Sequence, residues 1–169
     1  MDHTSKTVYS CGILTISDKG SRGERVDTSG MQLKSQISAG GFEIAAYDIV
    51  PDHRQAISKT LIDWVDHRRL DLIITTGGTG VSPNDLTPEA TKEILDKEIP
   101  GISEAMRQAS LQKTVHAMLS RSLAGIRKKS LIINLPGSEK AARENLECVL
   151  AALPHALYKI KGGSGDCGG

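Results

Sequence analysis

Residues 72–91 read LIITTGGTGVSPNDLTPEAT, and this stretch is the strongest indication of the fold. The apolar run LII predicts a buried strand. It leads directly into GGTG, whose small residues let the backbone approach a ligand closely. Asp85 follows, and then Thr87 is predicted to N-cap a helix that has Pro88 at its first position. A strand, a glycine loop and a helix in this order favour phosphate as the ligand. The candidate phosphate-binding residues are Gly77, Gly78, Thr79 and Gly80.

The glycine loop does not match the common nucleotide-binding motifs. A P-loop needs a GK[ST] ending, but no lysine lies between Gly77 and Thr91. A dinucleotide fingerprint starting at Gly78 would require glycine at the position of Pro83. Two interpretations remain open for the residues alone: an anion-binding nest of backbone amides, or a set of ordinary turn glycines.

Two aspartates raise the same kind of choice. Asp85, beside the glycine loop, could share a Mg²⁺ ion with substrate phosphates, or it could be a turn or cap residue in the sequence PND. Asp52 follows a predicted strand, and D-x-x-Q from Asp52 to Gln55 also fits a capping box. If both acids share one crevice with the glycine loop, they indicate a magnesium-dependent nucleotide site.

Apolar segments alternate with helical patterns along the chain. Strands are predicted at residues 8–16, 42–50, 70–75 and 130–135; helices are predicted at 29–38 and 102–112 and from residues 52, 87 and 138. Strands that are almost continuously apolar imply a largely parallel sheet covered on both faces. Ligands bind such sheets at the carboxyl ends of the strands. The segments SDKGSRG, TGGTGVSPND and PGS all follow strand ends, so we expect them to converge on one crevice.

Composition limits the class of protein. The 169 residues suit one domain, predicted here at residues 1–162 with a flexible tail at 163–169. Lys and Arg (21) nearly balance Asp and Glu (20), and aromatic residues are 3%, so we do not expect nucleic-acid binding. Three widely spaced cysteines predict reduced thiols in a cytoplasmic protein. We expect neither export nor a membrane span, because the first ten residues are polar and no apolar run reaches ~18 residues.

The blocks TTGGTGVSPNDLTPEAT, MLSRSLAGIR and LIINLPGS, in this order, closely resemble the molybdopterin adenylyltransferases of molybdenum-cofactor biosynthesis, including the G domain of gephyrin. The resemblance runs from about residue 11 to residue 162. It implies a three-layer α/β/α sandwich with a mostly parallel sheet, usually a homotrimer. The implied reaction uses ATP and Mg²⁺ to adenylylate the terminal phosphate of molybdopterin and releases pyrophosphate. A molybdate-inserting partner would receive the product.

The resemblance also implies roles for individual residues. Asp52 and Asp85 match the catalytic acids that hold Mg²⁺. Gly77, Gly78, Thr79 and Gly80 match the phosphate loop, and Pro136, Gly137 and Ser138 match the nucleotide-side loop. Ser110, Ser120 and Arg121 match molybdopterin-binding positions, and Ser17, Asp18 and Asp27 match the more variable first loop.

The run Arg127–Lys128–Lys129 is interpreted as a solvated turn, and no histidine is assigned a role. One alternative function is a non-catalytic molybdopterin-binding or scaffold protein of the same fold, although the presence of both Asp52 and Asp85 favours an enzyme. The other is a nucleotide-cleaving hydrolase that resembles the domain of competence/damage-inducible proteins.

Overall fold

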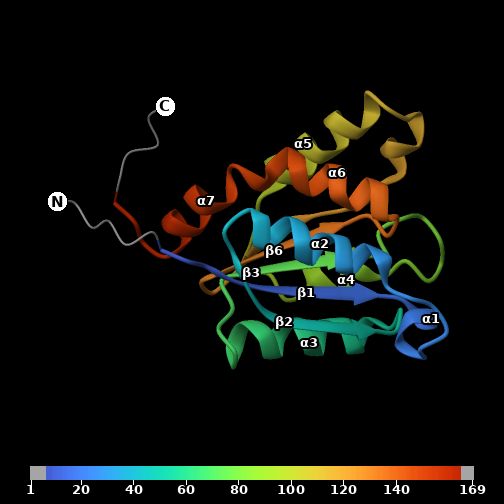
Figure 1. The fold of residues 1–169 in the computed structure, drawn as a ribbon, viewed down its shortest axis with the longest axis horizontal. Coiled ribbons are helices and arrows are strands. Elements are labelled where there is room, and N and C mark those ends of the chain that lie inside the picture. The colour runs from blue at the N-terminus through green and yellow to red at the C-terminus, as the bar shows by residue number, and fades with distance from the viewer. Residues whose placement is uncertain (1–6, 165–169) are drawn as a thin grey trace.

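A six-stranded sheet lies at the centre of the computed structural model, which describes residues 7–164 (Figure 1). The strand order is β2-β1-β3-β6-β5-β4. The strands are β1 (Ser10–Ile16), β2 (Glu43–Val50), β3 (Leu72–Thr76), β4 (Lys97–Glu98), β5 (Ala124–Arg127) and β6 (Ser130–Leu135). Neighbours among β2, β1, β3 and β6 pair in parallel, whereas β5 pairs antiparallel with both β6 and β4. The expectation of a mostly parallel sheet is confirmed.

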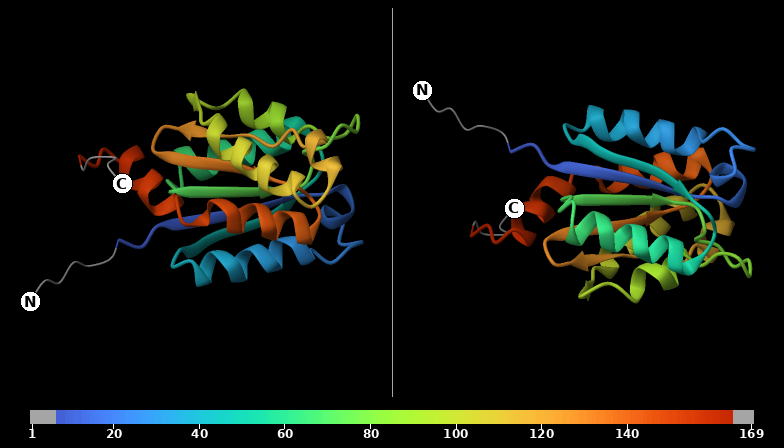
Figure 2. Two further views of the ribbon diagram at one scale, coloured as in Figure 1. Left: turned by 90° about the horizontal axis from the view of Figure 1, so that it is seen from above. Right: turned by 90° about the horizontal axis from the view of Figure 1, so that it is seen from below.

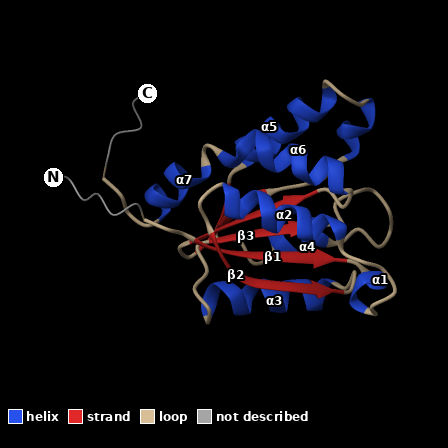
Figure 3. Ribbon diagram, viewed as in Figure 1, coloured by secondary structure: helices blue, strands red, loops and turns tan. Residues whose placement is uncertain are grey.

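Helices cover both faces of the sheet (Figures 2 and 3). One face carries α2 (Thr28–Ala39), α5 (Pro100–Leu111), α6 (Glu139–Leu150) and α7 (Leu153–Ile160); the other carries α3 (Arg54–Asp66) and α4 (Thr87–Lys92). The short α1 (Asp18–Ser21) and the 3₁₀ helix η1 (Val115–Leu119) lie in loops. The three-layer α/β/α sandwich is therefore confirmed. Among the helices of residues 7–164, none is long and apolar enough to cross a membrane.

The buried strands supply a core to each face because their side chains alternate. On β1, Cys11 and Ile13 join the cluster under α2, α5, α6 and α7, whereas Leu14 and Ile16 join the cluster under α3 and α4. All five residues of β3 are buried. A strand that is buried on both faces reads as a continuous apolar run, which is why β3 was predictable from LII.

The antiparallel edge of the sheet was not predicted. β4 has two residues, both exposed, so it lacks an apolar pattern. β5 has four residues and is joined to β6 by a tight turn in which Lys128 has a φ of 53°. The helix predicted from residue 138 is confirmed as α6, with Ser138 as its N-cap; it ends at Leu150, and α7 follows as a separate helix.

Arg127 does not lie in a solvated turn, and that prediction is wrong. Its Nε and Nη2 atoms donate to the two carboxylate oxygens of Asp66 at 3.0 and 2.7 Å, and Nη1 donates to the carbonyl of Ile94 at 2.9 Å. Only 20% of the Arg127 side chain and 18% of the Asp66 side chain are exposed. This fork-to-fork pair joins the end of α3 to β5.

The predicted flexible tail falls mostly outside the described residues, which end at residue 164. Its first residue, Gly163, donates its backbone N–H to the carbonyl of Tyr158 at 2.9 Å. The end of α7 is therefore closed by a backbone hydrogen bond that includes the first tail residue.

Candidate functional site

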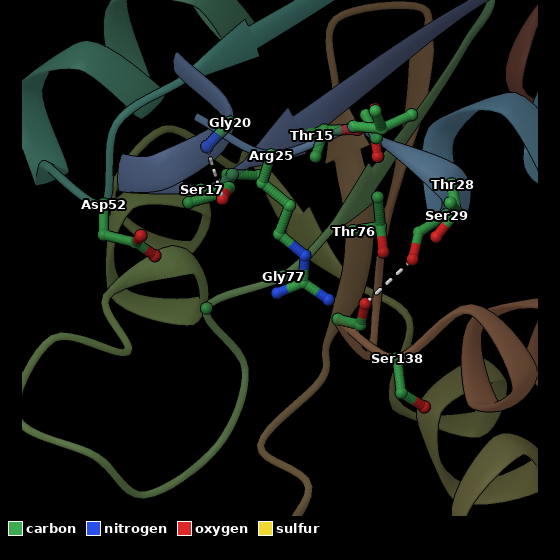
Figure 4. A pocket seen from close by; sticks show the side chains of 15 residues that line it. Thr15, Ser17, Gly20, Arg25, Thr28, Ser29, Asp52, Thr76, Gly77 and Ser138 are labelled. Carbon is green, nitrogen blue, oxygen red and sulfur yellow. Dashed lines mark hydrogen bonds between the residues drawn. The ribbon is translucent and has the colours of Figure 1, made fainter. Parts of the chain in front are cut away.

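Two pockets lie side by side at the carboxyl ends of the parallel strands. The first has a volume of about 400 Å³, and its lining includes Ser17, Arg25, Asp27, Asp52, Gly78 and Ser138 (Figure 4). The second has a volume of about 330 Å³, and its lining includes Thr79, Gly80, Ser110, Ser120, Pro136 and Asn145. Gly137 lines both pockets. The GGTG loop is divided between them: Gly77 and Gly78 face the first pocket, whereas Thr79 and Gly80 face the second.

The glycine loop has a conformation that ordinary turn residues would not adopt easily. Gly77 and Gly78 have φ values of 102° and 65°, in the region that favours glycine. A side chain at Gly77 would also collide with the carbonyl of Ile16 at the end of β1. The N–H of Gly77 donates to the carbonyl of Leu135 at 3.2 Å, so an anion nest in this loop would be formed by the amides that follow Gly77.

Two threonine hydroxyl groups hold the glycine loop and the neighbouring Pro136 loop in place. Thr87 donates its hydroxyl to the carbonyl of Gly77 at 2.8 Å, and Thr76 donates its hydroxyl to the carbonyl of Pro136 at 2.7 Å. The N-cap of α4 is Leu86, and Thr87 is the first residue of this helix. The predicted cap residue instead holds the glycine loop against the start of the helix.

Asp52 is held by the first loop and does not cap a helix. The capping-box interpretation is wrong, because the N-cap of α3 is His53 and makes no side-chain cap bond. Asp52 and Asp18 instead exchange two hydrogen bonds: each backbone N–H donates to the carboxylate of the other residue at 2.9 Å. Asp18, for which the sequence implied a looser role, thus positions Asp52 at the edge of the first pocket.

The electrostatic environment of Asp52 is unfavourable for its negative charge. Burial raises the pKa of its carboxyl group, and the carboxylates of Asp18 and Asp85 raise it further, against the lowering effect of the Asp18 N–H. A divalent cation would relieve this repulsion. Magnesium commonly takes only one or two carboxylates together with substrate phosphates and water. Within residues 7–164, no group of three or more His, Cys, Asp or Glu side chains could hold a metal ion.

Asp85 lies in the loop beyond the two pockets and lines neither of them. Its carboxylate accepts a hydrogen bond from the N–H of Ser82 at 2.8 Å. This contact is the one expected if Asp85 is a turn residue in the sequence PND. It nevertheless lies near enough to Asp52 to raise the pKa of that group. The first pocket brings together Asp52, Gly78 and Ser138, whereas Asp85 lies outside it, so the two acids do not both line this pocket.

Arg121 braces the loop in this structure. Its Nε donates to the carbonyl of Gly80 and its Nη2 to the carbonyl of Asp85, both at 2.6 Å, and its guanidinium forms an ion pair with Glu89. Arg121 lines neither pocket. Its predicted contact with molybdopterin stays a prediction, and the observed contacts favour a positioning role.

The other two predicted molybdopterin residues face the second pocket. The hydroxyl of Ser110 accepts a hydrogen bond from the side-chain amide of Asn145 at 2.8 Å. The hydroxyl of Ser120 donates to that of Ser122 at 3.1 Å. Arg107 donates to the carbonyls of Ser120 and Ser122 and so supports the segment before β5.

The remaining residues of the first loop have structural partners. Ser17 caps α1 by accepting from the N–H of Gly20 at 3.0 Å. Asp27 caps α2 through Gly30 and also accepts 2.6 Å hydrogen bonds from the hydroxyls of Thr15 and Tyr47. Both residues line the first pocket, so they combine a capping role with a place in its wall.

Several pocket residues were missed by sequence reasoning, namely Thr15, Arg25, Ser29, Thr76, Arg107 and Asn145. A signal existed for Arg107, because it lies three residues before Ser110 and therefore on the same side of a predicted helix. Arg25 carried no such signal within a polar loop.

Comparisons with known proteins show the family to which the chain is similar. Residues 12–155 match the family model described as "probable molybdopterin binding domain". A molybdopterin adenylyltransferase of Helicobacter pylori is 46% identical over 154 residues, which are 89% of this chain and 87% of that protein. Gephyrin of Dictyostelium discoideum is 47% identical, but this chain matches only 22% of its length.

The fold is also that of a solved relative. The crystal structure of a molybdopterin biosynthesis enzyme from Thermus thermophilus superposes with a TM-score of 0.87 at 54% identity, covering 92% of this chain and 98% of that one. Sequence match, fold and the strand-end pockets are mutually consistent. The chain therefore belongs to the molybdopterin-binding domain family of molybdenum-cofactor biosynthesis.

Proposed function

We propose that the protein is a molybdopterin adenylyltransferase that transfers AMP from ATP to the terminal phosphate of molybdopterin. The observation that carries this proposal is the pair of adjoining pockets separated by the glycine loop. A transfer between two bound substrates needs two sites that open onto one reaction point. A binding protein or a simple hydrolase would need only one.

The residues that line each pocket indicate which substrate it would bind. ATP is assigned to the first pocket, where Gly77, Gly78 and Ser138 lie with Asp52. Molybdopterin is assigned to the second, where the hydroxyls of Ser110 and Ser120 can meet polar pterin groups. Gly137 and the glycine loop lie where the two phosphate ends would meet.

The reaction joins two anions. An oxygen of the molybdopterin phosphate attacks the α-phosphorus of ATP and forms the new phosphoanhydride bond. The bond from the α-phosphorus to the bridging oxygen breaks, and its electron pair leaves with pyrophosphate. The loop amides of residues 78–80 would hold the phosphates in line, which lowers the barrier without a covalent nucleophile, whereas the N–H of Gly77 donates to the carbonyl of Leu135 at 3.2 Å.

Mg²⁺ is part of the proposal. Asp52 would hold the ion, with Asp85 contributing negative charge from the neighbouring loop. When bound, Mg²⁺ neutralises the triphosphate and stabilises the charge of the leaving group. The reciprocal hydrogen bonds between Asp52 and Asp18 keep the carboxylate of Asp52 at the pocket edge in the absence of substrate.

The test is incubation of the protein with molybdopterin, ATP and Mg²⁺, with quantification of adenylyl-molybdopterin and pyrophosphate. Equal amounts of both products are expected. ATP consumption without molybdopterin would instead indicate the hydrolase, and tight molybdopterin binding without product would indicate the scaffold function. Omission of Mg²⁺ from the same assay tests the metal requirement.

The family resemblance carries three further expectations into this proposal. We expect a cytoplasmic homotrimer, and we expect its product to pass to a partner that inserts molybdate. Light scattering of the purified protein measures the oligomer. Addition of a molybdate-inserting partner to product-loaded protein tests the hand-over.

A further inference from the structure

The side chains that line the first pocket carry more negative than positive charge, which is unfavourable for a ligand with a triphosphate. Its lining includes the carboxylates of Asp27 and Asp52. Of the described residues that line it, Arg25 alone has a cationic side chain. A triphosphate retains negative charge even with one divalent cation, so two carboxylates without a protein cation would disfavour its entry. Arg25 is therefore the side chain that makes the electrostatics of this pocket suitable for ATP.

The backbone on both sides of Arg25 is fixed. Before it, the N–H of Glu24 donates to the carbonyl of Lys19 at 2.9 Å. After it, Asp27 is held by Gly30, Thr15 and Tyr47. From this anchored loop the side chain of Arg25 points into the pocket, between Asp52 on one side and Thr76 and Ser29 on the other (Figure 4).

The guanidinium of Arg25 is left without a protein partner among the described residues, although acids surround it. Glu24 is taken by Arg22, whose Nε and Nη2 donate to its two oxygens at 2.8 and 3.0 Å. Asp27 accepts from two hydroxyls and a backbone N–H, and Asp52 accepts from the N–H of Asp18. An unpaired guanidinium that points into this pocket of about 400 Å³ is suited to bidentate recognition of a ligand phosphate.

We propose that Arg25 binds the β- and γ-phosphates of ATP and stabilises pyrophosphate as it leaves. This inference rests on the proposed function for its reaction step. Arg25 lines the first pocket and not the second, which separates it from the molybdopterin phosphate. As the bond between the α-phosphorus and the bridging oxygen breaks, negative charge accumulates on pyrophosphate, and a guanidinium that binds those phosphates lowers the energy of that state.

The chain offers a matched control for the test. Arg22 lies on the same loop, but it is paired with Glu24 and does not line the pocket. Pyrophosphate, ATP, AMP and molybdopterin binding are measured by calorimetry for the wild type, Arg25→Ala, Arg25→Lys and Arg22→Ala. We expect Arg25→Ala to weaken pyrophosphate and ATP binding about tenfold, the scale of one charge-assisted contact. AMP and molybdopterin binding and Tm should match the wild type.

The conservative variant separates charge from geometry. Arg25→Lys should recover part of the pyrophosphate affinity, because it restores the charge without the planar fork. Arg22→Ala should leave all four affinities unchanged. In the transfer assay, Arg25→Ala should lower kcat/KM for ATP while KM for molybdopterin stays constant.

Three results would overturn the assignment. Unchanged pyrophosphate affinity in Arg25→Ala would show that the side chain does not reach these phosphates. An equal loss for AMP would place it at the nucleoside end, and a loss for molybdopterin alone would place it at the other substrate. Pyrophosphate binding needs no transfer, so a wild type that binds pyrophosphate through Arg25 but forms no adenylyl-molybdopterin would reject the proposed function and leave this contact standing.

Discussion

The two ends of the sheet treat a partly buried aspartate in opposite ways. At the carboxyl end, burial and the neighbouring acids Asp18 and Asp85 raise the pKa of Asp52. At the amino end, hydrogen bonds from Arg127 and Lys128 lower the pKa of Asp66 to about 2. Arg127 and Lys128 form ion pairs with Asp66, whereas no cation within residues 7–164 forms an ion pair with Asp52. The difference indicates that the amino end stabilises the fold, whereas the carboxyl end retains an unfavourable charge for a ligand to neutralise.

Replacement of Asp52 should have the largest effect. Asp52→Asn keeps an acceptor for the N–H of Asp18 but removes the charge. We expect adenylyl transfer to fall on the order of 10²-fold or more, since the charge that holds the metal is lost. Tm at neutral pH should rise, because the repulsion with Asp18 and Asp85 disappears. Transfer rates and melting curves measure both effects, and the exposed Asp48→Asn is the control. A lower Tm with unchanged transfer would make Asp52 a structural residue like Asp66.

Asp85→Asn should have a smaller but clear effect on transfer. Asparagine can still accept from the N–H of Ser82, so the turn should persist. We expect the rate to fall about tenfold or more through the lost charge, with molybdopterin affinity and Tm near those of the wild type. Asp85→Ala, which also loses the acceptor, should in addition melt earlier. If Asp85→Asn transfers AMP at the wild-type rate, Asp85 is a turn residue and Asp52 is the only acid that the reaction needs.

The same contrast explains what the sequence could and could not predict. The elements around the glycine loop were predictable because apolar runs, glycines and capping residues act on the backbone next to them. β3, β6 and the Ser138 cap can each be predicted from residues that are adjacent in the sequence. The partner of Arg127 lies 61 residues away on another element. The partner of Asp52 lies 34 residues away. No local pattern identifies such pairs, so Arg127 was interpreted as a solvated turn residue, and a capping box stayed open as one interpretation of Asp52 beside its catalytic role.

The site was predictable to a similar extent. The family motifs and the strand-end rule brought Gly77, Gly78, Ser138 and Asp52 to one pocket. They did not predict that the loop divides two pockets, because that division depends on the positive φ values of Gly77 and Gly78 and on the position of Gly137. Local sequence therefore identifies which residues can bind phosphate, but not the surfaces between which they lie.

Arg127→Ala tests the amino end of the comparison. The change removes three hydrogen bonds from a pair that is largely shielded from water and leaves Asp66 without its main partner. We expect Tm to fall by several degrees, while kcat and KM measured below the melting transition stay at wild-type values. Lys129→Ala, on the adjacent exposed turn, is the control. A change in KM for either substrate would show that the two ends of the sheet are coupled and would weaken the contrast.

The smallest effect, and the most direct comparison of the two aspartates, is the pH dependence of Tm. The folded-state pKa of Asp66 is about 2, below its ordinary value of ~3.9, so its stabilisation is present above that ordinary value and is lost as pH falls toward 2. The folded-state pKa of Asp52 is raised, so its ionisation destabilises the fold above that pKa, and the penalty disappears as pH falls through it. Melting curves are therefore recorded for the wild type, Asp66→Asn and Asp52→Asn between pH 7 and pH 3. At pH 7, we expect the Tm of Asp66→Asn to lie below that of the wild type and the Tm of Asp52→Asn to lie above it. Both differences should shrink on acidification, because the wild-type carboxyl groups take up protons. An Asp66→Asn deficit that is constant with pH would mean that Arg127 acts there through packing alone, and the electrostatic contrast between the two ends would fail at Asp66.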